Sequence, residues 1–315
     1  MIFSTRLLSC FGCLSHLASP ILGLALQPGR HLLSTRAAPY QTRILATGTT
    51  FAEENNGVWQ LIDATGDGIP DLAYIKTSNT GTNSVEVHIA SSSSNFKTRI
   101  FEAGTTFSLE NDGTWLLVPS KSSTLPDLVF IKTSNTPTGR VEVHIASGAS
   151  SYKTRTLETA TVFGNENNGV WKLYDYDGDG ILDLVYIKTS NAGSNSVEVH
   201  VASGSSTYSQ FILHTGTTFA QENNGFWSLA PYSSPRAADL AYIKDANTAG
   251  SVEVHIASAS SVYQTRILEV GSTYGEESNG VWSLIDYSRD GVLDLAYIKY
   301  QNTGTGTVEV HVAAG

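Results

Sequence analysis

Cysteine and methionine are almost missing from this sequence: Cys10, Cys13 and Met1 are the only ones in 315 residues. The two cysteines form a Cys-x-x-Cys pair, but no βαβ pattern follows it, so redox chemistry is not indicated. Beyond Cys13 no disulfide can form within the chain, which must therefore be held together by its core and its topology. The chain also lacks any Asn-x-Ser/Thr acceptor for N-glycosylation.

Charged side chains are scarce, at 15% of the chain, and the formal net charge is −10. Residues 1–39 contain three Arg and no acid, so the rest carries 16 basic against 29 acidic side chains, a net charge of −13. This excess argues against nucleic acid, whose binding needs a basic face, and against anionic membrane surfaces. No segment after the first 26 residues is apolar for long enough to be inserted into a membrane.

Residues 1–26 have the pattern of a secretory signal peptide. Arg6 lies in a short basic region, an apolar stretch runs from Leu7 to Leu24, and small residues around Ala25 offer a cleavage site. We therefore expect a secreted, extracellular protein, with residues 27–39 as a linker or pro-segment and residues 40–315 as the folded domain.

The folded part consists of five copies of one unit of about 56 residues. Each copy contains one Trp, at Trp59, Trp115, Trp171, Trp227 and Trp282. Each also contains an Asp-Leu pair that begins at Asp71, Asp127, Asp183, Asp239 and Asp294. A Val-Glu-Val-His run closes each copy, at His88, His144, His200, His255 and His311. A fixed period over five copies predicts a repeat architecture.

Each copy is predicted to form four β-strands, here called a to d. In the first copy these are Val58–Asp63, Leu72–Thr77, Val85–Ala90 and Thr98–Glu102. The middle strands are apolar on both faces, as expected when sheets are covered on both sides. Four short strands per repeat predict an all-β protein, a five-bladed β-propeller of four-stranded blades.

The two ends of the domain are expected to close the ring. Residues Tyr40–Leu45 match strand d, while the chain ends in a strand c at Val308–Val312. The N-terminal strand can therefore complete the last blade, which leaves no free sheet edge. In such a blade the d–a and b–c loops lie on one face, and the a–b and c–d loops on the other.

The a–b loop of the third copy lies within WKLYDYDGDGILDLVYIK, residues 171–188. Oxygen side chains at alternate positions of a glycine-bearing turn are suited to Ca²⁺. The alternative is an Asx-turn whose carboxylates are solvated. The predicted metal ligands in this copy are Asp175, Asp177, Asp179 and Asp183. The first and fifth copies keep three aspartates each, at Asp63, Asp67, Asp71, Asp286, Asp290 and Asp294.

The d–a loops carry a carboxylate and an amide close to the Trp of each copy. Glu and Asn can bind sugar hydroxyls, and an indole can pack on the apolar face of a sugar ring. The alternative is a turn that uses Asn-Gly for its backbone and Trp for the core. The candidate ligand-binding residues are Glu54, Asn56, Trp59, Glu110, Asp112, Trp115, Glu166, Asn168, Trp171, Glu222, Asn224, Trp227, Glu277, Asn279 and Trp282.

The repeated Glu-x-His is not interpreted as a catalytic pair, because catalysis needs one assembled site and this pair occurs five times. We expect instead a cross-strand pairing of Glu86 with Arg99, and of Glu142 with Arg155. No carboxylate pair, Ser/His/Asp set or His/Cys cluster stands outside the repeat, so no enzyme is predicted.

The aspartate turn followed by Asp-Leu, on a repeating four-strand unit, resembles the FG-GAP/VCBS repeat of integrin-like propellers. It is closest to the secreted propeller lectins of fungi and bacteria. The best-known relatives have seven blades, whereas five are counted here. The resemblance implies a carbohydrate-binding protein with several equivalent weak glycan sites on one face and structural calcium in some a–b loops. The alternatives are an integrin-like protein-binding scaffold and a glycan-targeting module that lacks its enzyme.

Overall fold

The computed structural model describes residues 38–315. The predicted signal peptide, both cysteines and most of the predicted linker lie outside the described residues. Among the residues described, no helix is long and apolar enough to cross a membrane.

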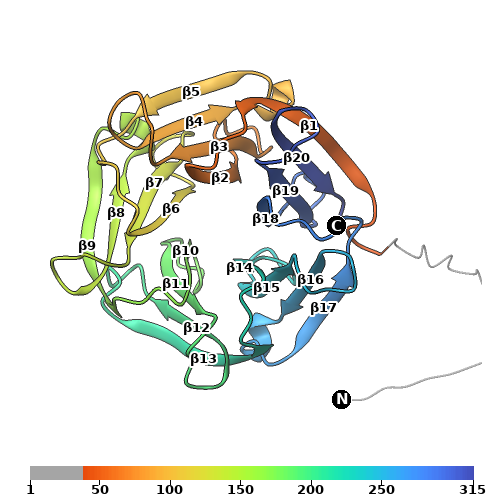
Figure 1. The fold of residues 1–315 in the computed structure, drawn as a ribbon. Helices are drawn as coiled ribbons and strands as arrows, with labels where there is room; N and C mark the ends of the chain where they lie inside the picture. Colours follow the sequence, from red (N-terminus) through yellow and green to blue (C-terminus); the bar gives the residue numbers. More distant parts are fainter. Residues whose placement is uncertain (1–37) are drawn as a thin grey trace, which may run out of the picture. The chain divides into compact units, whose positions relative to one another are not determined.

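The described chain forms five antiparallel sheets of four strands each. The sheets are arranged as the blades of a β-propeller, with the first strand of each repeat innermost (Figure 1). This confirms the predicted fold. The four strands of blade 1 are β2 (Gly57–Ile62), β3 (Asp71–Lys76), β4 (Glu86–Ala90) and β5 (Arg99–Gly104). Those of blade 2 are β6 (Gly113–Val118), β7 (Asp127–Lys132), β8 (Arg140–Ala146) and β9 (Arg155–Gly164).

The remaining blades repeat this order. Blade 3 contains β10 (Gly169–Tyr174), β11 (Asp183–Lys188), β12 (Ser196–Ala202) and β13 (Phe211–Ala220). Blade 4 contains β14 (Gly225–Ala230), β15 (Asp239–Lys244), β16 (Glu253–Ala257) and β17 (Arg266–Gly271). Blade 5 contains β18 (Gly280–Ile285), β19 (Asp294–Lys299), β20 (Thr307–Ala313) and, from the other end of the chain, β1 (Arg43–Ala52). Three short 3₁₀ helices follow strands c, at Ser92–Ser94, Gly148–Ser150 and Ala259–Ser261.

The N-terminal strand closes the ring, as predicted. β1 pairs with β20 in antiparallel register, with Leu45 opposite Val312. It lies along the outer edge of blade 5 in Figure 1. Just before it, the buried Tyr40 donates its backbone N–H to the carbonyl of Ala314 at 2.6 Å. The observed strand begins later than the predicted Tyr40–Leu45 and extends further, to Ala52.

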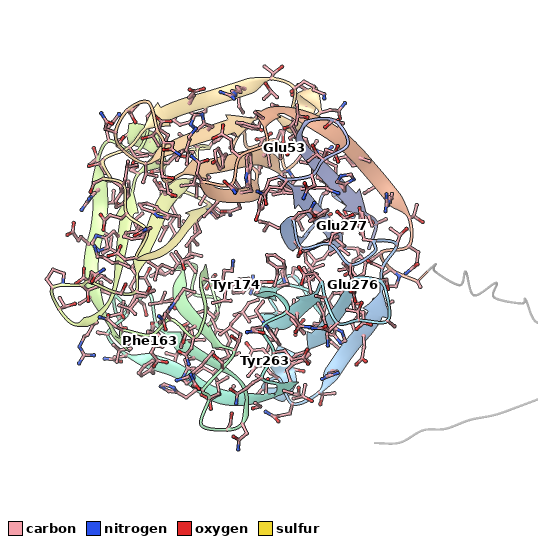
Figure 2. The ribbon with its side chains drawn as sticks, viewed as in Figure 1. Glu53, Phe163, Tyr174, Tyr263, Glu276 and Glu277 are labelled. Atoms are coloured by element: carbon pink, nitrogen blue, oxygen red, sulfur yellow. The ribbon has the colours of Figure 1, made fainter. Side chains whose placement is uncertain are left out.

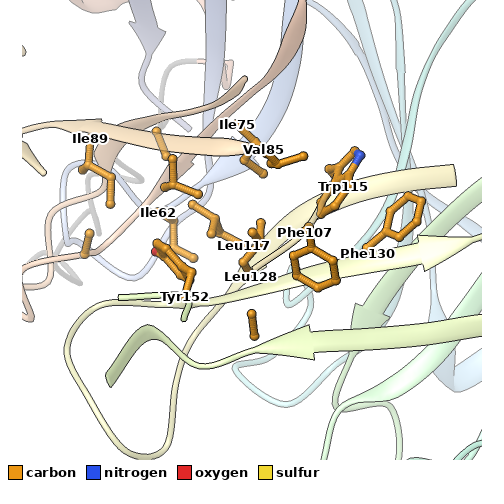
Figure 3. Packing of buried hydrophobic residues seen from close by; sticks show 14 residues of the cluster. Ile62, Ile75, Val85, Ile89, Phe107, Trp115, Leu117, Leu128, Phe130 and Tyr152 are labelled. Atoms are coloured by element: carbon orange, nitrogen blue, oxygen red, sulfur yellow. The ribbon is translucent and has the colours of Figure 1, made fainter. Parts of the chain in front are cut away.

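The core lies between neighbouring blades. In β3, Leu72 and Tyr74 pack toward blade 5, whereas Ala73 and Ile75 pack toward blade 2. Figure 3 shows the second of these clusters, in which Ile75 lies with side chains of blade 2 that include Trp115 and Leu128. Both faces of a middle strand are therefore buried, which explains its continuous apolar sequence.

The predicted pairing of Glu86 with Arg99, and of Glu142 with Arg155, is wrong. In an antiparallel hairpin the start of strand d lies opposite the end of strand c, so Arg99 lies opposite Ala90 and Glu86 opposite Gly104. Arg99 instead pairs with Glu102 at 3.0 Å on its own strand. The equivalent pair in blade 2 is Arg155–Glu158, at 2.9 Å.

Candidate ligand-binding ring and aspartate turns

Each d–a loop is tied to the strand b and b–c loop of its own blade. In blade 3, the Glu166 carboxylate lies 2.7 Å from the Lys188 ammonium group. The Asn168 side chain accepts a hydrogen bond from the Tyr186 hydroxyl at 2.6 Å and donates one to the carbonyl of Ser190. Burial, and to a smaller degree the negative Glu166, raise the pKa of Tyr186. The predicted Glu and Asn residues are thus brought together, and part of their hydrogen-bonding capacity is used within the blade.

The same ties occur in the other blades. The Glu–Lys distances are 2.7 Å for Glu54–Lys76, 2.8 Å for Glu222–Lys244 and 2.6 Å for Glu277–Lys299. The distance from the Tyr hydroxyl to the Asn side-chain oxygen is 2.6 Å in each of the pairs Asn56–Tyr74, Asn224–Tyr242 and Asn279–Tyr297. The loops therefore share one geometry, as equivalent sites require.

Two of these residues differ in blade 2. Phe130 stands where the other blades have Tyr, and Asp112 stands where they have Asn. Phe130 has no hydroxyl group that Asp112 could bind. Asp112 instead forms an ion pair with Lys132 at 3.3 Å, and Lys132 also forms one with Glu110. The hydrogen bonds that Lys132 donates to Glu110 and Asp112 raise its pKa, and they outweigh the opposing effect of burial. One Asp112 oxygen remains buried without a hydrogen-bond partner.

The five tryptophans lie in the core between blades and not on the loop surface. Trp59 is 2% exposed and stacks on Tyr74, with ring centroids 4.0 Å apart. Its indole N–H donates to the backbone carbonyl of Glu54 at 3.1 Å, so the ring also holds the loop in place. Trp115, Trp171, Trp227 and Trp282 are equally buried. A ring that is 2–4% exposed offers too little surface for a sugar to stack on, although Trp171 reaches the wall of one polar pocket.

The glycine that follows each Asn is required by close packing. A Cβ on Gly57 would lie 2.2 Å from the carbonyl oxygen of Ile75 and 2.8 Å from the Tyr74 ring. The backbone of the d–a loop therefore runs directly against strand b. This contact, and not a left-handed turn, explains why a glycine is repeated at this position in all five blades.

Shallow polar pockets lie where two blades meet on this face. One pocket of about 260 Å³ is formed by Thr133 and Ser134 of the blade 2 b–c loop and by Asn167 of the next d–a loop. Another, of about 240 Å³, is formed by Glu53, Glu54 and Asn55 with Gln301 and Asn302 of blade 5. Figure 2 labels Glu53, Glu276 and Glu277, on the loops that enter blades 1 and 5. The middle loop residues were not among the predicted ligand residues, yet they are exposed: Asn55, Asn111, Asn167, Asn223 and Ser278.

The aspartate turns lie on the opposite face, as predicted. In blade 3, oxygens of Asp175, Asp177 and Asp183 lie within 4.8 Å of one another and could hold a metal ion. One carboxylate oxygen of Asp175 is buried and accepts no hydrogen bond. A cation would satisfy that oxygen, so the residues present fit a hard metal ion. Asp179 is outside this cluster and accepts the N–H of Ile181 at 2.7 Å.

Asp183 also has a structural role that does not require a metal. Its two oxygens accept backbone N–H groups of Gly204 at 2.7 Å and Tyr176 at 2.8 Å, so it joins the c–d turn to the a–b turn. Burial raises the pKa of Asp183 above 3.8, and the nearby Asp177 adds to the rise. Asp71, Asp127 and Asp239 make the equivalent contact to the c–d turn at 2.8 Å, and Asp294 accepts the N–H of Gly315, after strand c of blade 5, at 2.9 Å. This role explains why the Asp-Leu pair occurs in all five copies.

The turns of blades 1 and 5 are satisfied by their own backbone. Asp63 accepts the N–H groups of Gly66 at 2.7 Å and Gly68 at 2.9 Å. Partial burial would raise the pKa of Asp63, but these hydrogen bonds outweigh it and lower the pKa below 3.8. Asp286 similarly accepts two backbone N–H groups, while Asp67 and Asp290 each accept one. Within residues 38–315, the three-aspartate cluster of blade 3 is the one group of three or more acids, histidines or cysteines close enough to share a metal ion.

No protein-family model matches the sequence, and no curated protein matches it. Among solved structures, the catalytic domain of Coprinopsis cinerea GH62 alpha-L-arabinofuranosidase has a TM-score of 0.54 at 9% identity, covering 88% of this chain and 98% of that chain. The crystal structure of BBS1N in complex with ARL6DN, soaked with lead, has a TM-score of 0.41 at 10% identity and covers 87% and 97%. At 9% identity the likeness to the arabinofuranosidase domain concerns the fold alone, and the five four-stranded sheets make the chain a five-bladed β-propeller.

Proposed function

We propose that this propeller is a secreted carbohydrate-binding protein with several equivalent shallow sites on the face that carries the d–a and b–c loops. The observation that carries the proposal is the repetition, at successive blade junctions, of an exposed polar side chain, an Asn in four blades and Ser278 in blade 5, beside a Glu–Lys pair. Exposed amides, next to carboxylates that an ion pair holds in place, offer the directional hydrogen bonds that sugar hydroxyls need. The single-site affinity should be weak, since these pockets are shallow and polar.

Repetition favours binding over catalysis. A catalytic site needs one assembled set of acid, base or nucleophile, whereas this face offers similar groups five times. Several weak sites on one rigid ring raise the avidity for a glycan-coated surface by about 10²–10⁴ when they bind simultaneously. The GH62 neighbour is named for an arabinofuranosidase, which accords with a carbohydrate ligand and suggests arabinose-containing glycans as ligands to test.

We further propose that the aspartate cluster of blade 3 holds Ca²⁺ with a structural role. Its ligands are all oxygens, which suits a hard cation. Asp175 and Asp177 would bind the ion, and Asp183 would connect it to the c–d turn. The turn and the repeat pattern also support a relationship to FG-GAP/VCBS propellers.

A glycan array with calcium present tests the carbohydrate proposal. Asn167→Ala and Asn223→Ala each remove an exposed side chain that makes no hydrogen bond among the described residues, so the fold should be retained. Each should weaken binding to a glycan surface and lower the number of monovalent sites by about one. Arg236→Ala, in an exposed a–b loop on the opposite face, is the control. Absence of binding across an array that includes arabinose-containing glycans would reject the proposal and favour a protein-binding scaffold.

A further inference from the structure

A cavity of about 730 Å³ lies inside the ring, lined by the innermost strands of all five blades, β2, β6, β10, β14 and β18. It extends from Phe226 and Val281, at the start of their strands, to Pro119 and Pro231 in the a–b loops. The cavity is therefore separate from the junction pockets on the loop face.

The lining of this cavity is mostly aliphatic and aromatic, with one charged side chain, Lys172. Tyr174, two residues further on, lies toward the ring centre in Figure 2 and uses its hydroxyl to bind the Ala237 carbonyl at 2.7 Å. The position held by Lys172 is equivalent to Gln60, Leu116, Ser228 and Ser283 in the other blades. The fold therefore does not require a lysine here.

The ammonium group of Lys172 has neither a hydrogen bond nor an ion pair with any residue between 38 and 315. Gln60 differs, because its amide both donates to and accepts from the backbone of Leu117, at 2.8 and 2.9 Å. The Lys172 side chain lines the cavity, and the accessible surface that it retains is attributed to the cavity. The loss of water around its ammonium group lowers its pKa. An unpaired charge in apolar surroundings is costly for folding unless a partner neutralises it.

We propose that the central cavity binds a small organic anion with an apolar body, whose carboxylate pairs with the ammonium group of Lys172. Its volume lies within the range of small-molecule sites, about 300–1,000 Å³, and such sites combine apolar walls with few polar groups. The apolar body would lie against the aliphatic side chains of the innermost strands. A single site per chain follows, since only one of the five equivalent positions is a lysine.

Isothermal titration with decanoate, and with decanol as a neutral chain of equal length, tests the proposal. The parent should bind one decanoate per chain, and decanol should bind much more weakly. Lys172→Ser, which introduces the residue of blades 4 and 5, should weaken decanoate binding by about tenfold or more, because the buried carboxylate loses its partner. Lys172→Gln should act in the same direction. Lys97→Ser, at an exposed lysine of a c–d loop, is the matched control and should bind like the parent.

The variants should fold, since removal of an unpaired buried charge does not weaken the core, and thermal unfolding checks this. Failure of decanoate to bind the parent would overturn the proposal. Equal decanoate affinity in the parent and in the folded Lys172→Ser variant would also overturn it. Neither outcome bears on glycan binding at the blade junctions.

Discussion

The carboxylate of Glu53 accepts a hydrogen bond from the backbone N–H of Thr303 at 2.9 Å, across 250 positions of sequence. The bond joins the d–a loop that enters blade 1 to the b–c loop of blade 5. Equivalent bonds connect Thr136 to Asn165 at 3.2 Å and Thr248 to Glu276 at 2.6 Å. At the junction between blades 3 and 4, Gln221 accepts the N–H of Ala192 at 3.3 Å. The residue before the repeated Glu therefore ties its loop to the neighbouring blade at four of the five junctions.

The junction between blades 1 and 2 lacks this tie, and repairing it should stabilise the ring. Here Leu109 takes the place of the acceptor and is 43% exposed, while the Thr80 hydroxyl is buried without a partner. Leu109→Gln should raise the free energy of unfolding by about 0.5–1.5 kcal/mol, the net value of one hydrogen bond. Urea denaturation measures the effect, with Leu109→Ala as the control. Equal stability of the two variants would show that no tie forms.

Ring closure by the N-terminal strand should dominate stability. Compared with a chain that begins at residue 38, removal of residues 38–46 deletes the buried Tyr40 and much of the pairing between β1 and β20. A loss of several kcal/mol should lower Tm by roughly 10 °C or more, at about 2–4 °C per kcal/mol for larger domains. Differential scanning calorimetry measures it. A shortened chain with unchanged Tm would contradict closure by this strand.

Calcium should stabilise the protein through blade 3 alone. An ion that binds only the folded state adds about 2.7 kcal/mol at a hundredfold excess over Kd, so Tm should rise with calcium and fall with EDTA. Asp175→Asn with Asp177→Asn should abolish this difference. Asp179→Asn, outside the cluster, and Asp63→Asn, in a turn satisfied by its own backbone, should retain it. A calcium response that survives in the Asp175/Asp177 double variant would place the ion elsewhere.

Blade 3 should also respond to pH differently from its neighbours. His200 and His214 face each other with their Nδ1 atoms 2.6 Å apart, where blades 1, 2 and 4 pair the His with a Glu. Burial, partly offset by Glu198 but reinforced by His214, lowers the pKa of His200 below 6.5. The folded state then binds fewer protons than the unfolded state, so this contribution to stability is present above pH 6.5 and is lost as pH falls through the folded pKa.

His214→Glu should reduce that loss, because it gives His200 the acidic partner found in the other blades. We expect Tm to fall between pH 7 and pH 5 by less in this variant than in the parent. Glu198 has a pKa below the ordinary value of 4.5, so its own titration affects the stability of the fold mainly at a lower pH than this range. Parallel Tm profiles over this range would show that the histidine pair has no such role.

The repeat period was enough to predict the blades, because a strand buried on both faces leaves a continuous apolar pattern in every copy. Closure was predicted for a different reason: residues 40–45 read YQTRIL, the same sequence as residues 263–268 at the strand d of blade 4. The ties such as Glu53–Thr303 could not be predicted, since they join loops of different copies and depend on blade geometry. The pairing of Glu86 with Arg99 failed because both residues lie at the starts of their strands, and in an antiparallel hairpin the start of one strand lies opposite the end of the other. Lys172 gave no signal, since its position varies among copies.

Two adjacent residues of the d–a loop, Asn167 and Asn168, should differ in role: Asn168 should matter for stability and Asn167 for ligand binding. Asn168→Ala would leave the Tyr186 hydroxyl and the Ser190 carbonyl without their partner, and unsatisfied buried groups cost about 1–3 kcal/mol. Asn167→Ala removes an exposed amide and should change stability by less than about 0.5 kcal/mol. Urea denaturation compares the two, and Asn223→Ala with Asn224→Ala repeats the comparison in blade 4.

Because only the exposed amide is free to meet a ligand, Asn167→Ala should weaken glycan binding while its unfolding curve stays that of the parent. A large loss of stability in Asn167→Ala would instead place that side chain in the fold and remove it from the binding surface.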